Sequence, residues 1–305
     1  MLAILLLLVG CGSPQEGTNG SATPADAPPP PPPRNAHEMA SEIVQGDIGV
    51  LVHVDRVRKH KLAPRLQTLP GVGDTFEGTG IEPLRDVDRI FVAAKDASDR
   101  EAVIMVAEHH VPPEKVKAAM QAMVDKSGED GGFLKDYPVP AARVSVRGRK
   151  SVILAVNDTL MVVTSEVYAK GAAVLGKTGG LPMPNGKAAV TARANKPSES
   201  LKAKYAPAIP PTIEHATAEV TLGNDGGAFV NVVGQSTSAE QAQADATELT
   251  HNLEQAASVK VSVVRIRVFE PIAFHAEGDQ VKGERKIARS ELERLIGLAG
   301  MLSGQ

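Results

Sequence analysis

Hydrophobic and polar positions alternate along residues 38–305 with two different periods. Short runs such as Glu101–Glu108 are apolar on both faces and predict a strand in the interior of a sheet. Elsewhere apolar residues recur every three or four positions, as Val116, Met120 and Met123 do after Pro112, and this spacing predicts amphipathic helices. The mixture predicts an α+β fold: an antiparallel sheet with the helices packed on one side.

Part of this pattern occurs twice. Residues Arg89–Val124 match His215–Thr250 without a gap, and each copy predicts a strand, a polar turn, a second strand and a helix. Only five of the 36 aligned residues are identical, among them Asp99 and its counterpart Asp225. The repetition lies in the pattern rather than in identity, and it predicts a diverged internal duplication.

The segments on either side extend the match, so that each half is predicted as βα–ββα–βββα. We expect the first repeat at residues 38–180 and the second at 187–305, packed together as one compact unit. The further elements expected are strands at Gly49–Asp55, Ser151–Asn157, Thr159–Thr164, Ala189–Asn195, Pro271–Glu277 and Gln280–Ile287, and helices at Arg56–Leu69, Ser198–Tyr205, Ser238–Ala256 and from Ser165 and Ser290 onward.

Helix-start signals support two of these helices. Ser238 with Gln241 and Ser290 with Glu293 have the spacing of capping boxes, in which a serine hydroxyl accepts a hydrogen bond from a backbone amide of the first turn. Residues 259–269 fit either a strand or a continuation of the preceding helix, and the sequence leaves both open.

The chain begins with the apolar run MLAILLLLVG. Ten residues form a helix of only ~15 Å, too short for a hydrocarbon core of ~30 Å, so residues 1–10 predict the apolar region of a signal peptide. The next step rests on a resemblance: Leu8-Val9-Gly10-Cys11 resembles the lipobox of bacterial lipoproteins. That resemblance implies cleavage before Cys11, attachment of a diacylglycerol to Cys11, and membrane contact through the acyl chains. The residue after the cysteine, Gly12, resembles that of lipoproteins sorted to the outer membrane rather than to the inner membrane.

Residues 11–37 are rich in Gly, Ser, Thr and Pro and lack hydrophobic periodicity. Such a segment buries too little apolar area to offset its ordering entropy, so we expect a disordered tether. The six prolines at Pro28–Pro33 predict a semi-rigid spacer, and the alternative is a ligand for a proline-binding module.

Composition narrows the function. The balance of 33 basic and 36 acidic residues is not that of a nucleic-acid-binding protein. A single cysteine cannot form an internal disulfide or a multi-thiolate metal site. Nine aromatic residues, none of them Trp, argue against a cleft that stacks sugars or bases.

Residues Gly171–Thr178, GAAVLGKT, match the phosphate-binding P-loop pattern. A P-loop follows a strand and opens a helix, whereas here the match lies at the end of a predicted helix, Ser165–Leu175, and glycines and prolines follow. Gly176 instead fits a helix C-cap, and Lys177 complements the helix dipole. We therefore expect no nucleotide and no cofactor.

The histidines are the remaining candidates for chemistry. His109 and His110 are adjacent in a strand, so their side chains point to opposite faces and cannot bind one ion together. His53 shares a face with Asp55, and His60 follows, but no metal-binding spacing is present, and we expect no metal. The acidic segment Asp125–Gly132 lacks the spacing of a calcium loop and predicts a flexible loop.

The folded part of the chain resembles exported bacterial proteins with strands like Asp86–Ala94 and a final hairpin and helix, a group to which no activity is assigned. The sequence therefore leaves three functional hypotheses. The first hypothesis is a non-catalytic binding or scaffolding lipoprotein of the envelope, with a possible envelope protein partner. The second is a carrier of an apolar ligand. The third is a hydrolase that joins a serine to His53, His109 or His110, which stays open because such sites are recognised by geometry.

Overall fold

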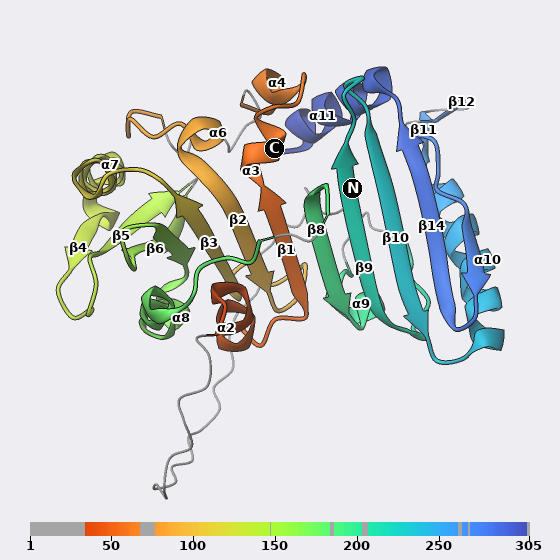
Figure 1. Ribbon diagram of the computed structural model, residues 1–305, viewed down its shortest axis with the longest axis horizontal. Helices are drawn as coiled ribbons and strands as arrows, with labels where there is room; N and C mark the ends of the chain where they lie inside the picture. Colours follow the sequence, from red (N-terminus) through yellow and green to blue (C-terminus); the bar gives the residue numbers. More distant parts are fainter. Residues whose placement is uncertain are drawn as a thin grey trace, which may run out of the picture.

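The computed structural model describes residues 34–67, 77–146, 148–183, 186–202, 207–261, 264–267 and 269–303. The largest feature of the described residues is one antiparallel sheet of twelve strands, with helices on both of its faces (Figure 1). An α+β fold with a large antiparallel sheet, as predicted, is confirmed. Cys11 and most of the expected tether lie outside the described residues.

The strands follow each other across the sheet in the order β13-β14-β10-β9-β8-β1-β2-β3-β7-β6-β5-β4, and every neighbouring pair is antiparallel. A separate hairpin pairs β11 with β12. The strands are β1 (Ile48–His53), β2 (Val87–Ala94), β3 (Val103–His109), β4 (Gly132–Leu134), β5 (Ala141–Val146), β6 (Arg149–Ala155), β7 (Leu160–Thr164), β8 (Ala188–Asn195), β9 (Ile213–Leu222), β10 (Ala228–Ser236), β11 (Ser258–Val261), β12 (Val264–Arg267), β13 (Phe274–Glu277) and β14 (Gln280–Ile287).

The helices vary from single turns to eighteen residues. They are α2 (Ala36–Ile43), α3 (Val54–Val57), α4 (Ala63–Gln67), α6 (Pro83–Asp86), α7 (Pro113–Lys126), α8 (Glu166–Ala172), α9 (Pro197–Ser200), α10 (Ala239–Ala256) and α11 (Arg289–Ser303), with 3-10 turns at Gly128–Asp130 and Ala173–Lys177. None of the helices in the described part of the chain has the length and apolarity that a membrane span requires.

The two faces of the sheet carry different helices, and the prediction that all helices pack on one side is wrong. We call the face with α2 and α8 the front face; its core includes Phe91, Ile104 and Val162. The rear face carries α7, which packs on Ile153 and Met161. The physical reason lies in β6, where Val152, Ile153 and Leu154 are apolar in succession: alternate side chains point to opposite faces, so both faces need a cover.

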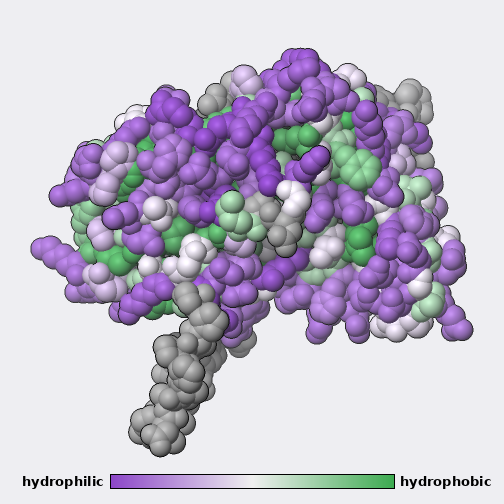
Figure 2. Space-filling model, viewed as in Figure 1, coloured by the Kyte–Doolittle hydropathy of each residue, from purple (hydrophilic) through white to green (hydrophobic). Residues whose placement is uncertain are grey.

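The second half differs from the first in its front face. Its helices α10 and α11 both pack on the rear, against Val281 and against Val220 and Val230 respectively. The front faces of β9, β10 and β14 carry mainly polar residues, which suit a solvated sheet face. Figure 2 shows this face as largely hydrophilic, with small hydrophobic patches. Its members include Thr217, Glu219, Thr221, Phe229, Asn231, Val233, Lys282, Glu284 and Lys286.

Several expected elements are confirmed. Helices α7 and α10 occupy their predicted positions, and the hydroxyl of Ser238 accepts a hydrogen bond from the amide of Gln241 at 3.1 Å, as expected for the cap. Strand β3 lies inside the sheet, between β2 and β7, as its apolar faces predicted. Within the segment 259–269, which the sequence left open, residues 259–261 belong to β11 and residues 264–267 form β12; residues 262, 263 and 268 lie outside the described residues.

Other elements differ from expectation. In the described part of the helix expected at 198–205 the structure has the single turn α9, and in that of the helix expected at 56–69 it has two separate helices, α3 and α4; residues 68–69 and 203–205 lie outside the described residues. Ser290 lies inside α11 and does not cap it. Ala36 and His37 were assigned to the tether but belong to α2, because Ala36 is buried in the front core.

Candidate functional site

The first half of the sheet, strands β1 to β7, meets the second half, strands β8 to β10, β13 and β14, at one seam. Strands β1 and β8 pair antiparallel there, with Leu51 opposite Thr191. On the front face above this pair lies a groove of about 250 Å³, which we call the seam groove. It is lined by residues of α2, β1, β2, β8 and β9 and of the chain between the halves: His37, Gly49, Leu51, Phe91, Pro182, Thr191, Ala192, Arg193, Thr217, Ala218 and Glu219.

Among the described residues that line the seam groove, Arg193 is the one cation. A Cβ atom built on Gly49 would lie only 2.9 Å from its Nε, so its side chain extends from β8 across β1. Its Nη2 donates a hydrogen bond to the Ser41 hydroxyl at 3.0 Å, and that hydroxyl donates to the carbonyl oxygen of His37 at 2.8 Å. The guanidinium is therefore held beside α2, and glycine at position 49 leaves the space for it.

His37 forms the α2 side of the groove. Its ring meets Phe91 edge to face, with centroids 5.6 Å apart and planes at 82°. Burial lowers the pKa of His37, and the charge of Arg193 lowers this pKa further, although Glu38 opposes the shift. Its buried Nδ1 has no hydrogen-bond partner among the described residues. The imidazole is therefore neutral at neutral pH.

Glu219 brings the opposite charge. It lies on β9, opposite Thr191 of β8, and it is exposed on the front face. Within the described ranges neither Glu219 nor Arg193 belongs to an ion pair. The seam groove thus presents one cation and one anion over an apolar floor that includes Leu51 and Phe91.

The chain between the halves forms another wall of the groove, and two charged residues hold it. Arg89 and Glu108 form an ion pair on the front face of β2 and β3. Arg89 Nη1 donates to the carbonyl oxygen of Leu181 at 2.8 Å, and the amide of Leu181 donates to Glu108 Oε2 at 3.2 Å. This connector clamp fixes Leu181 and therefore the neighbouring groove residue Pro182.

The histidines singled out from the sequence do not share a site. His53 is buried at the end of β1, and burial followed by the charge of Arg56 lowers its pKa. His109 is also buried, and its Nδ1 accepts a hydrogen bond from the amide of Val111 at 3.2 Å. His60 contacts the carbonyl oxygen of Gly227 through Nε2 at 3.2 Å and so joins the two halves.

His110 belongs to a polar network at the start of β2. Its Nδ1 lies 3.0 Å from Asp88 Oδ2, while Asp88 Oδ1 accepts from Arg58 Nη2 at 3.2 Å. Arg58 also donates to the carbonyl oxygen of Val87 at 2.6 Å. These contacts join α3, β2 and the segment after β3.

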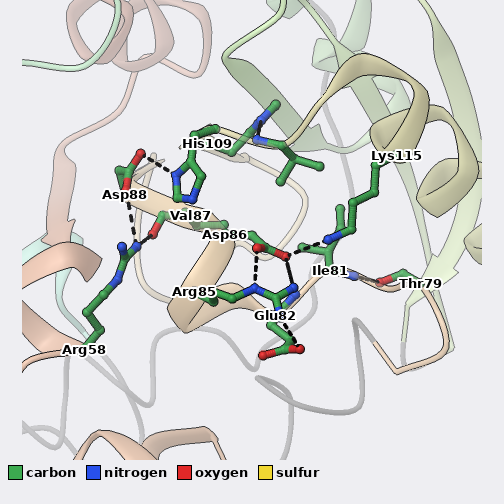
Figure 3. A network of polar contacts seen from close by, with 12 residues as sticks. Arg58, Thr79, Ile81, Glu82, Arg85, Asp86, Val87, Asp88, His109 and Lys115 are labelled. Carbon is green, nitrogen blue, oxygen red and sulfur yellow. Dashed lines mark hydrogen bonds and ion pairs between the residues drawn. The ribbon is translucent and has the colours of Figure 1, made fainter.

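Asp86 is the centre of the same network (Figure 3). Arg85 Nε donates to its Oδ1 at 2.7 Å, and Lys115 Nζ and the amide of Glu82 donate to its Oδ2 at 3.3 and 2.9 Å. The Arg85 hydrogen bond is the main cause that holds the pKa of Asp86 well below its usual range. Because each of its oxygens has donors, we interpret the network as structural rather than catalytic.

The two remaining motifs have structural explanations. GAAVLGKT lies in α8 and the following 3-10 turn, not between a strand and a helix. Gly176 is inside that turn rather than at the C-cap, and a Cβ there would collide with the carbonyl oxygen of Val156. The acidic segment expected to be a flexible loop contains the Gly128–Asp130 turn, and Lys150 pairs with Asp130 at 2.7 Å.

No three or more His, Cys, Asp or Glu side chains are arranged to hold a metal in the part of the chain described. Sequence reasoning did not identify His37, Arg193 or Glu219 as site residues, because they are far apart in the chain and follow no motif. Comparison with family models, with curated proteins and with solved structures finds no match to this chain.

Proposed function

We propose that the protein is a membrane-anchored lipoprotein of the cell envelope, and that its folded part is a non-catalytic binding module. The observation that carries the binding role is the seam groove, in which Arg193 and Glu219 lie over an apolar floor and neither forms an ion pair with another described residue. A groove with a few convergent polar groups over apolar residues is the usual form of a binding site.

Binding is proposed ahead of hydrolysis because of the surroundings of the histidines. A hydrolase of the expected kind needs a serine hydroxyl within hydrogen-bond reach of a histidine. Within the described ranges, the hydrogen bonds of His109 and His110 go to the Val111 amide and to Asp88 instead. The Nε2 of the third candidate, His53, is buried and has no hydrogen-bond partner among the described residues.

The membrane anchor is supported by the sequence Leu8-Val9-Gly10-Cys11. Two acyl chains on Cys11 would suffice for stable attachment. The test is the intact mass of the protein purified from its native host. A mass that corresponds to a chain beginning at a diacylated Cys11 supports the proposal, and an unmodified chain beginning at Met1 refutes it.

We also propose that the two halves descend from one duplicated unit. Strand order supports this, because β1-β2-β3-β7-β6 and β8-β9-β10-β14-β13 run outward from the seam in matching sequence. One observation limits the match: Ile104 of β3 faces the front core, whereas its aligned partner in β10, Val230, faces α11 at the rear. An alignment that includes this change therefore needs a one-residue shift in the third strand.

The binding role is tested by photo-crosslinking in living cells. A photoreactive residue replaces Thr217, which is exposed in the seam groove, and in a matched control it replaces Lys117, which is exposed on α7 at the rear. We expect a discrete adduct from position 217 that position 117 does not produce. Equal labelling from both positions, or none from position 217, would contradict the proposal.

The second candidate, a carrier of an apolar ligand, is favoured by a strip on the rear face. Val52, Ile90, Val92 and Met105 lie on neighbouring strands there, and each is partly exposed. Native mass spectrometry of the purified protein tests it: a co-purified lipid that is lost in Ile90→Asn but retained in Val167→Asn, an exposed control on α8, would favour the carrier. A lipid-free wild type would eliminate it.

A further inference from the structure

The position of the two charges in the seam groove indicates what the groove binds. Arg193 is paired with Thr217, and Glu219 with Thr191, so the two charged residues are diagonal neighbours on adjacent strands. Long side chains in this relation are close enough to interact. Here no ion pair forms within the described residues, because Arg193 turns away across Gly49 to the Ser41 hydroxyl. The guanidinium is thus held over β1 beside α2, whereas Glu219 projects from β9, two strands away.

We propose that the seam groove binds a small zwitterion, a free amino acid or a dipeptide. Its carboxylate pairs with Arg193, its ammonium group pairs with Glu219, and its apolar side chain lies against Leu51 and Phe91. This inference rests on the proposed binding function and names the ligand class of the same site.

Charge argues against other small ligands. A simple anion attracted by Arg193 meets the carboxylate of Glu219, and a simple cation attracted by Glu219 meets the guanidinium. A ligand with both charges satisfies both residues. Burial lowers the pKa of the neighbouring imidazole of His37, which disfavours a third charge beside the groove.

The volume of the seam groove also favours an amino acid or a dipeptide. A volume of about 250 Å³ lies below the ~300–1,000 Å³ of typical pockets for larger small molecules. Thr191 and Thr217 also line the groove, and threonine hydroxyls suit the polar backbone of an amino acid or a dipeptide.

Isothermal titration calorimetry on the full-length protein tests the inference. The probes are leucine, alanyl-leucine, N-acetyl-alanyl-leucine and alanyl-leucine amide. We expect alanyl-leucine to bind, and we expect each blocked form to bind at least about tenfold more weakly, since each loses one charged contact. The affinity for leucine compared with that for alanyl-leucine shows whether the groove prefers a free amino acid or a dipeptide.

Two variants assign the charges. Arg193→Gln abolishes the preference for the free carboxylate, and Glu219→Gln abolishes the preference for the free ammonium group. Their matched controls are Arg294→Gln and Glu284→Gln, both at exposed positions outside the groove, which retain the wild-type preferences. Because each variant is judged by a ratio of affinities, a general loss of folded protein does not imitate the expected result.

Equal affinity of the wild type for free and blocked peptides would overturn the inference, as would the absence of binding to every probe. If no probe binds but crosslinking from position 217 yields an adduct, the zwitterion is wrong and the binding function stands. If both experiments fail, the binding function is wrong as well.

Discussion

The connector clamp makes a quantitative prediction about stability. Replacing Glu108 with Ala removes the partner of Arg89 and leaves the amide of Leu181 without its acceptor. The side chains of Arg89 and Glu108 are only 14% and 19% exposed, so water replaces these interactions poorly.

The magnitude follows from the hydrogen bonds that the substitution removes. A hydrogen bond to a charged group contributes about 1.5–3 kcal/mol, and a buried amide left without a partner costs about 1–3 kcal/mol. Because the pair is partly exposed and the two effects overlap, we expect Glu108→Ala to lower the free energy of unfolding by about 2–4 kcal/mol. The control is Glu166→Ala, which breaks a more exposed ion pair with Arg143 and should cost about 1 kcal/mol or less.

The assay is urea denaturation of the wild type, Glu108→Ala, Arg89→Ala and the double variant. Since both residues act on Leu181, the loss in the double variant should be smaller than the two single losses together by at least about 1 kcal/mol. Additive losses, or a loss for Glu108→Ala no larger than that of Glu166→Ala, would refute the clamp.

Two further predictions concern stability. Burial lowers the pKa of His53 and His109, so below about pH 6.5 the unfolded chain binds protons that the native state does not. The free energy of unfolding should therefore fall as the pH decreases below about 6.5. Urea denaturation between pH 7.5 and 5.5 that shows no such fall would contradict this prediction. In the same assay, Leu154→Ala in the front core should lower the free energy of unfolding by about 2–5 kcal/mol. The control Val167→Ala, at a residue that is 79% exposed, should change it by less than about 0.5 kcal/mol. Equal losses of unfolding free energy in the two variants would contradict the assigned core.

The sequence predicted those elements that carry strong local signals. Helices α7 and α10 combine a regular apolar spacing with a start signal, proline in one case and Ser238 in the other. It did not predict the face on which each helix packs, because an apolar stripe requires a cover but does not choose one. Helices α8 and α11 both follow hairpins, yet α8 packs at the front with Val162 and α11 at the rear with Val230.

The residues of the candidate site could not be predicted from local sequence patterns. Arg193 and Glu219 look like ordinary solvated residues of two strands, and only the pairing of β8 with β9 brings them together. His37 was assigned to the tether because it follows a proline-rich segment, whereas the packing of Ala36 and Ala40 brings it into the fold. A register between distant strands depends on the whole sheet, which no short motif encodes.

The pairing of β1 with β8 has a consequence for any attempt to divide the chain. Either half produced alone would expose the backbone amides and carbonyls of a strand that now has a partner on each side. Such an open edge recruits further strands, and the antiparallel geometry at the seam would allow two identical halves to join edge to edge. Covalent continuity between the halves therefore protects against self-association, and an isolated half should aggregate or dimerise rather than remain a monomer.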